Sequence, residues 1–265
     1  MKIGKAPEPS GVISDLIKAA RATGVKGLFQ VFESIEQEGK SYAIQVYKGK
    51  RDVLMVDKHR GVRLLEQDMK MYEKTLEKWL KNIVKIDEKY FGFQSGKSTV
   101  DAVFVFGQLQ EKFGETKNEL FLVFVDLEKA FERVPREAIR WALRRQKVPE
   151  RLIALVMALY SNARSRVRTL AGTSDEFGIG VGVHQGSALS PLLFVVVMQE
   201  ATREARGEGL WDLLYADDLV ITAESEEEAV RKFGVWKREM ETRGLKVNIN
   251  KTKLMVMGRE PADRS

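Results

Sequence analysis

The sequence predicts an α+β protein whose sheet is largely antiparallel. Short apolar runs have the length and composition of strands, and longer stretches show the apolar spacing of helices. Strands and helices alternate without a run of parallel βαβ units, which favours the α+β class. The chain of 265 residues is long enough to bury a large core, in one large domain or two subdomains.

The first half of the chain begins with helical patterning over residues 14–39. A basic strand–turn–helix region then extends to about residue 88, and its helix has apolar positions at Leu64, Leu65, Met69, Tyr72, Leu76 and Leu80. A helix is expected over about 99–113. Residues 121–125 are continuously apolar, which predicts a strand that is covered on both faces.

The second half continues with a helix over 136–146, because Pro135 is a favourable first residue for a helix. The remaining predicted elements are a helix over 150–162, a hairpin that pairs 165–170 with 177–181 around a turn at 172–175, an apolar helix over 189–206, a second hairpin over 213–221, an amphipathic helix over 226–243 and a final strand over 245–257.

Two adjacent carboxylates, Asp217 and Asp218, lie at the tip of the second hairpin between apolar flanks. An Asp-rich turn is common on protein surfaces, so this pair alone predicts no site. A third carboxylate, Asp126, ends the strand over 121–125, several residues before the next helix. If the three met, they would bind two divalent cations about 3.5–4 Å apart, as in phosphoryl transfer, and Mg²⁺ prefers such oxygen ligands. The spacing in sequence leaves this contact open.

Four motifs in order resemble motifs A to D of reverse transcriptases, most closely those of non-LTR (long interspersed element type) retrotransposons. They are Phe-Val-Asp-Leu-Glu-Lys-Ala-Phe over 124–131, His-Gln-Gly-Ser-Ala-Leu-Ser-Pro-Leu-Leu-Phe over 184–194, Tyr-Ala-Asp-Asp over 215–218 and Gly-Leu-Lys-Val-Asn-Ile-Asn-Lys-Thr-Lys over 244–253. The resemblance implies a right-hand polymerase with fingers over 1–115, a palm over 116–260 and a short tail over 261–265. No thumb is recognisable.

The same resemblance assigns roles in catalysis. Asp126, Asp217 and Asp218 would be the catalytic and metal-binding carboxylates, with Mg²⁺ or Mn²⁺ as the ion. Lys251 matches the motif D lysine, which could protonate or neutralise the leaving pyrophosphate, although a solvated lysine is an equal alternative. Phe131 matches an aromatic steric gate that excludes a 2′-hydroxyl, whereas most phenylalanines are simply core residues.

Further residues are implied to contact the substrates. Gln185 and Gly186 would line the incoming nucleotide, because a glycine before a helix lets the backbone approach a ligand; the alternative is a plain turn. A second group would hold the triphosphate or the nucleic-acid backbone, unless these are solvated charges: Lys48, Lys50, Arg60 and Lys97. His184 is interpreted as a neighbour of the site.

The leading hypothesis is therefore an RNA-directed DNA polymerase that uses an RNA template, a DNA primer and deoxynucleoside triphosphates. The sequence also departs from the family pattern, with a small deletion after residue 37, Glu132 in place of aspartate and Gln94 in place of arginine. These departures keep open a second hypothesis, an inactive nucleic-acid-binding remnant of a retrotransposon polymerase. An unrelated two-metal nuclease is supported by the acidic cluster alone.

Composition agrees with a nucleic-acid partner but does not require one. The formal net charge is +6, from 44 basic and 38 acidic residues. The chain has no cysteine, which fits a reducing intracellular setting such as the nucleus or cytoplasm. No signal peptide or membrane-spanning run is visible, so no membrane partner is expected.

Overall fold

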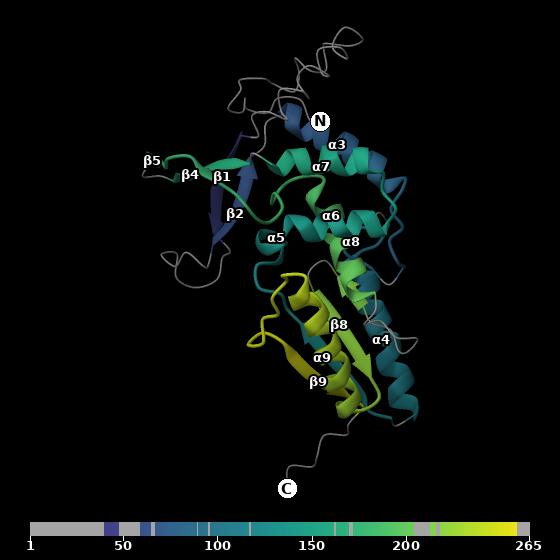
Figure 1. The fold of residues 1–265 in the computed structure, drawn as a ribbon. Helices are drawn as coiled ribbons and strands as arrows, with labels where there is room; N and C mark the ends of the chain where they lie inside the picture. Colours follow the sequence, from purple (N-terminus) through teal and green to yellow (C-terminus); the bar gives the residue numbers. More distant parts are fainter. Residues whose placement is uncertain are drawn as a thin grey trace. The chain divides into compact units, whose positions relative to one another are not determined.

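The computed structural model describes residues 40–47, 59–64, 67–88, 90–94, 96–116, 118–161, 163–169, 172–203, 213–215 and 218–258 (Figure 1). The helix predicted over 14–39 lies outside these residues. The described residues pack as two compact units. The first contains those up to Val84 together with Leu143–Ser190, and the second contains Lys85–Ala142 and those from Pro191 onward. Both units combine helices with sheets, which confirms the α+β class.

The sheet of the first unit is built around β4 (Arg164–Thr169). Its strand order is β2-β1-β4-β5, and β6 also pairs with β4. The other strands are β1 (Lys40–Tyr47), β2 (His59–Leu64), β5 (Gly172–Thr173) and β6 (Phe177–Gly178). β1 pairs with β2 antiparallel and with β4 parallel. The expected pairing of 165–170 with 177–181 is therefore wrong in extent, because among the described residues only Arg164 and Ser165 pair with β6.

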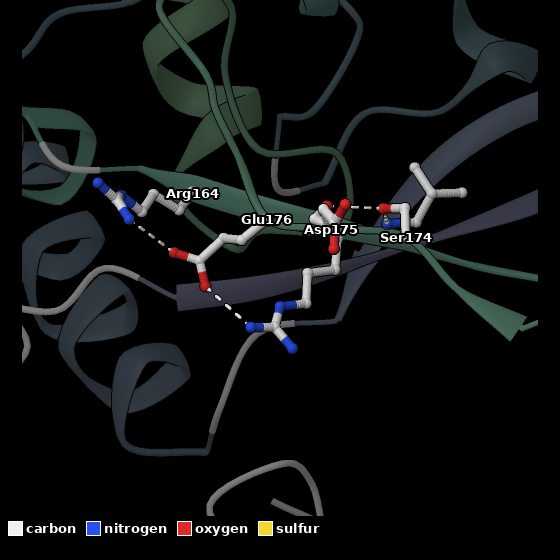
Figure 2. A network of polar contacts seen from close by, with 6 residues as sticks. Arg164, Ser174, Asp175 and Glu176 are labelled. Atoms are coloured by element: carbon white, nitrogen blue, oxygen red, sulfur yellow. Dashed lines mark hydrogen bonds and ion pairs between the residues drawn. The ribbon is translucent and has the colours of Figure 1, made fainter.

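Side chains stabilise the connection between β5 and β6. The carboxylate of Glu176 contacts the guanidinium of Arg164 at 3.1 Å and that of Arg166 at 3.5 Å (Figure 2). The hydroxyl of Ser174 accepts a hydrogen bond from the Val167 amide at 2.9 Å. Both arginines are exposed, with side-chain exposures of 64% and 47%, so each ion pair contributes little to stability.

Helix α3 (Gln67–Lys81) packs against α7 (Glu150–Ser161) in the first unit. The apolar stripe predicted for α3 is confirmed, because Met69, Tyr72, Leu76 and Leu80 are all buried. The assignment of Leu64 to this helix is wrong, since Leu64 ends strand β2. Leu65 lies outside the described residues.

The second unit contains an entirely antiparallel sheet with the strand order β7-β8-β3-β9. The strands are β3 (Leu120–Val125), β7 (Leu213–Tyr215), β8 (Asp218–Ala223) and β9 (Lys253–Met257). Helix α4 (Thr99–Thr116) packs Leu109 and Phe113 against Leu120 and Leu122 of β3. Helix α9 (Glu226–Thr242) contacts β3 and β8 and lies across the sheet in Figure 1.

Local signals account for the ends of α9. The hydroxyl of Ser225 accepts a hydrogen bond from the Glu228 amide at 3.2 Å and caps the first turn. After the last turn, Gly244 adopts a φ of +80°, and a Cβ there would lie 2.6 Å from Cγ of Pro135. Glycine is therefore the residue that fits this close approach. The prediction of a helix over 226–243 is confirmed.

Two other helices have bounds close to those expected, namely α6 (Arg136–Arg145) and α8 (Ser190–Thr202). The short helix α5 (Ala130–Arg133) was not predicted. α8 ends at Thr202, earlier than residue 206. None of the described helices is long and apolar enough to cross a membrane.

The predicted strand over 245–257 is wrong in its first half. Only 253–257 form β9, whereas Asn248 begins a turn in which its carbonyl accepts hydrogen bonds from the Lys251 and Thr252 amides. Asparagine is well suited to such a turn, because its backbone tolerates conformations outside the strand region. The turn ends at Lys251 and so fixes the backbone position of this residue.

Candidate active site

The hairpin that carries the paired carboxylates is formed by β7 and β8, with Tyr215 opposite Asp218. In the neighbouring ladder, Val125 of β3 is opposite Leu219 of β8. Asp126 follows Val125 and Asp218 precedes Leu219, so both carboxylates stand next to this last pair of the ladder. Asp217 lies outside the described residues, so its position relative to these two carboxylates stays a prediction.

Backbone hydrogen bonds fix the segment that begins at Asp126. The Asn248 amide donates to the Asp126 carbonyl at 2.8 Å, and the Glu128 amide donates to the Lys246 carbonyl at 2.8 Å. Between them, Leu127 forms a β-bridge with Val247, and both side chains are buried. The first and fourth motifs therefore meet along one short antiparallel contact, which holds the backbone of Asp126 rigidly.

The same contact places Lys251 beside Asp126. Nζ of Lys251 lies 3.2 Å from Oδ2 of Asp126, and the two side chains are 68% and 26% exposed. Oδ2 is itself buried and accepts no hydrogen bond from the described residues, so the contact with Lys251 is an ion pair without hydrogen-bond geometry. A rigid carboxylate oxygen that lacks a hydrogen-bond donor is a suitable ligand for a hard divalent cation. Asp126 therefore fits a metal-binding role.

A complete metal site would need more ligands than Asp126 and Asp218. Among the described residues, no three histidine or acidic side chains gather closely enough to hold an ion. The third carboxylate of the predicted set, Asp217, is not among those residues.

Phe131 lies on α5, five residues after Asp126, and is half-buried. Its ring stacks on that of Phe194, with centroids 4.5 Å apart and an interplanar angle of 23°. The ring of Phe93 meets it from another direction at 5.9 Å and 74°. Phe194 is fully buried, whereas Phe93 is 51% exposed. Neither partner was predicted, because nothing in the sequence pattern links these three positions.

In the first unit, Gln185 and Gly186 form a tight turn before α8. The Ser187 amide donates to the His184 carbonyl at 3.1 Å, and Gly186 adopts a φ of +92°. The Ser187 hydroxyl accepts from the Leu189 and Ser190 amides at 3.1 and 3.2 Å, which caps the helix. Gly186 is exposed and Gln185 half-buried. A turn into a buried helix is thus present, and the nucleotide-binding role of its residues stays a prediction.

The interpretation of His184 as a mere neighbour overlooked a buried polar contact. Nδ1 of His184 lies 3.6 Å from Oε1 of Glu73 on α3, and the two side chains are 1% and 0% exposed. The ring of Tyr160 lies 4.8 Å from the imidazole. The sequence could have predicted that Glu73 is buried, because this charged residue falls on the apolar stripe of α3 between Met69 and Leu76.

The structure gives side-chain contacts for only one of the four basic residues that are predicted to bind substrates. Lys48 and Lys50 lie outside the described residues, and Arg60 is placed only by its backbone pairing with Val46. Lys97 turns back onto its own loop, where Nζ donates to the carbonyls of Glu88 and Tyr90 and lies 4.8 Å from the Phe91 ring centroid. A role for Lys97 in nucleic-acid binding stays a prediction.

Residues 47–263 match the family described as reverse transcriptase (RNA-dependent DNA polymerase). The chain is 36% identical over 116 residues to the "Retrovirus-related Pol polyprotein from type-1 retrotransposable element R2" of Nasonia vitripennis, covering 41% of this chain and 11% of that protein. It is 26% identical over 175 residues to the "Probable RNA-directed DNA polymerase from transposon X-element" of Drosophila melanogaster, covering 63% and 19%.

A further relative is the "Probable RNA-directed DNA polymerase from transposon BS" of Drosophila melanogaster, 22% identical over 237 residues, or 83% of this chain and 26% of that protein. The chain thus spans between about a tenth and a quarter of the length of these curated relatives. The family match implies a palm-like polymerase fold and the use of divalent metal ions. Because the match covers most of its length, this chain belongs to the reverse transcriptase family.

Proposed function

We propose that this chain is an RNA-directed DNA polymerase that uses Mg²⁺. The observation that supports the proposal is the register of β3 on β8, which ends with Val125 opposite Leu219, the residues next to Asp126 and Asp218, within two motifs that resemble those of the family. The template would be RNA, the primer DNA and the substrates deoxynucleoside triphosphates. Residues 1–115 would act as fingers and 116–260 as the palm.

The reaction joins the primer 3′-oxygen to the α-phosphorus of the nucleotide and breaks the bond to the β-phosphate, so that pyrophosphate leaves. Asp126, Asp217 and Asp218 would hold the Mg²⁺ ions, with Mn²⁺ as a substitute. Bound ions activate the attacking oxygen and neutralise phosphate charge. Lys251, whose Nζ already lies at Asp126, would neutralise or protonate the leaving pyrophosphate.

The remaining predicted residues would select and hold the substrates. Phe131 would exclude a 2′-hydroxyl by contact with the sugar. Gln185 and Gly186 would line the nucleotide and its template base, with the exposed backbone of Gly186 offering close approach. Phosphate contacts would come from basic side chains, namely Lys48, Lys50, Arg60 and Lys97.

The test is primer extension on an RNA template with deoxynucleotides and Mg²⁺, using the parent chain and Asp126→Asn. We expect extension by the parent and a loss of at least about a hundredfold in the variant, because metal-assisted phosphoryl transfer depends on ligand charge. Glu128→Gln is the matched control. It removes one charge from the same segment, at a residue paired with Arg133 and Lys246 rather than predicted to bind metal.

Two results would contradict the proposal. Undiminished extension by Asp126→Asn would remove this carboxylate from the chemistry. A parent chain that binds primer–template in a salt-sensitive manner but never extends it would instead support the inactive remnant. The salt-dependent binding of primer–template is therefore measured together with extension, both for the parent chain and for Asp126→Asn.

A further inference from the structure

An exposed phenylalanine in an unfavourable backbone conformation contacts the predicted steric gate. Phe93 has a φ of +59°, in the left-handed region that residues with a Cβ seldom adopt. Its side chain is 51% exposed to solvent. Both features are unfavourable for a large apolar residue, and backbone outliers of this kind concentrate at functional sites. The contact that accompanies them is the one with Phe131 at 5.9 Å.

The loop that carries Phe93 is fastened on both sides of this residue. After it, Lys97 donates hydrogen bonds to the Glu88 and Tyr90 carbonyls, which closes the loop across its base. Before it, the amide side chain of Gln199 on α8 accepts from the Asp87 amide at 2.7 Å and donates to the Lys85 carbonyl at 2.8 Å. Phe93 is therefore presented by a closed loop with fixed ends.

Helix α8 thus fixes both neighbours of the Phe131 ring. It supplies Phe194 directly, as the stacked partner at 4.5 Å, and it supplies Gln199, which anchors the segment leading to Phe93. The Phe131 ring is contacted on its face by a buried aromatic and from another side by an exposed one. Such aromatic pairs have preferred geometries, so two of them restrict the ring more than one does.

We propose that Phe93 is a positioning residue that sets the Phe131 ring for discrimination between deoxyribonucleotides and ribonucleotides. The inference rests on the proposed function, in which Phe131 excludes the 2′-hydroxyl. A steric gate discriminates only if its ring cannot move aside, because a small displacement would admit one more oxygen atom. Phe194 restrains the ring from the protein interior, and Phe93 restrains it from the solvent side.

The test compares dATP with ATP, which differ only in the 2′-hydroxyl. The measured quantity is the ratio of their kcat/KM values in primer extension, from which the fraction of folded enzyme cancels. We expect Phe93→Leu to lower this ratio by about three- to tenfold, the range expected from losing one aromatic pair. Phe93→Gly should lower it equally while relieving the backbone strain, so reduced stability cannot explain the result. Phe93→Tyr, which keeps the ring, should stay within about twofold of the parent.

The matched control is Phe124→Leu. Phe124 is also exposed and also pairs with an aromatic ring, that of Phe106 at 6.2 Å, whereas the rings that meet Phe131 among the described residues are those of Phe93 and Phe194. This control should leave the ratio unchanged. Phe131→Leu is the reference for loss of the gate itself and should lower the ratio further than either Phe93 variant.

The discrimination between dATP and ATP is also measured without chemistry, as the ratio of their binding affinities. The complex used for this has a primer that ends in a dideoxynucleotide. An unchanged ratio in Phe93→Leu and Phe93→Gly, with a lowered ratio in Phe131→Leu, would overturn the role of Phe93 and leave the proposed function intact. An unchanged ratio in Phe131→Leu would overturn both the gate and its positioning. A parent chain that neither extends the primer nor binds dATP would overturn the proposed function, and this inference with it.

Discussion

Two contacts between a carboxylate and a basic side chain, one in each unit, differ in their access to solvent. Asp126 and Lys251 are 26% and 68% exposed and lie 3.2 Å apart. Glu73 and His184 are 0% and 1% exposed and lie 3.6 Å apart. Asp126, Lys251 and His184 lie within motifs that resemble those of reverse transcriptases, whereas Glu73 does not. The difference in burial nevertheless predicts that the first pair exchanges partners easily and that the second does not.

In the first pair the Lys251 side chain is largely exposed, so its ammonium can leave Asp126 at little energetic cost, because water takes its place around the ammonium. Such a carboxylate is free to take up a cation or a substrate group. For the buried pair water offers no such replacement, because both side chains lie in a poorly solvated interior. The contrast indicates that polar groups suited to chemistry lie at the accessible end of the second unit's sheet, and that the pair in the first unit serves to hold its motif in place.

The largest expected effect comes from the buried pair. Glu73→Ala should lower the free energy of unfolding by about 3 kcal/mol or more, because the imidazole of His184 would stay buried beside the space left by the carboxylate. Urea denaturation followed by circular dichroism measures this. Glu77→Ala is the matched control, one turn along the same helix, where Glu77 pairs with Lys81 at 2.7 Å near the surface. It should cost no more than about 0.5 kcal/mol. Equal effects at the two positions would contradict the difference drawn between buried and exposed pairs.

A smaller effect, on rate rather than stability, is expected from the exposed pair. Lys251→Gln should slow primer extension by about a hundredfold if its ammonium assists the leaving pyrophosphate. Stability should change by less than about 0.5 kcal/mol, since the side chain is exposed. The comparison variant is Lys246→Gln, a lysine of similar exposure that pairs with Glu128 at 3.6 Å on the same segment. A loss of activity in both variants alike would point to general positive charge instead of a specific role for Lys251.

The smallest effect belongs to a partly buried ion pair on α9, in which the Lys232 and Glu228 side chains are 13% and 36% exposed. The Lys232 side chain, which bonds to the carboxylate, and a hydrogen bond from the Glu224 amide lower the pKa of Glu228 below its ordinary value of 4.5. A lowered pKa stabilises the folded protein above the unfolded-state value, and this gain is lost as the pH falls through the folded-state value. Glu228→Gln should therefore cost at most about 0.5 kcal/mol at pH 7, because solvent screens the pair.

The difference between parent and Glu228→Gln should shrink as the pH falls below 4.5, which thermal unfolding at several pH values would follow. Glu227→Gln is the control, because Glu227 lies in the same first turn and shares its favourable position at the helix N-terminus. A difference that grows at acid pH would have the wrong sign and would contradict the assignment.

Prediction from the sequence succeeded where the signal was local. Helix α9 has a serine cap, a regular apolar spacing and a terminal glycine, and its observed bounds of Glu226–Thr242 agree with the expected ones. The parallel pairing of β1 with β4 was not predicted, because it joins strands more than a hundred residues apart and leaves no trace in the composition of either. The final strand was overextended because the turn at Asn248 lies within a run of alternating residues.

For the candidate site, the sequence by itself determined which side chains are available. The carboxylates Asp126, Asp217 and Asp218, the aromatic ring of Phe131 and the ammonium of Lys251 are properties of the motifs, and their order along the chain was enough to predict a family that the comparisons then showed. The residue types and their spacing within each motif are given by the sequence itself, so they can be inferred without coordinates.

Only the tertiary structure decided what each of these groups touches. The register of β3 on β8 placed the residues next to Asp126 and Asp218 opposite each other, the turn at Asn248 brought Lys251 to Asp126, and α8 fixed two aromatic neighbours of Phe131. A strand slip of one residue would reverse every side chain in it, yet would preserve the sequence and its propensities. Contacts of this kind arise from the packing of distant segments, which is why they appear only once the chain is folded.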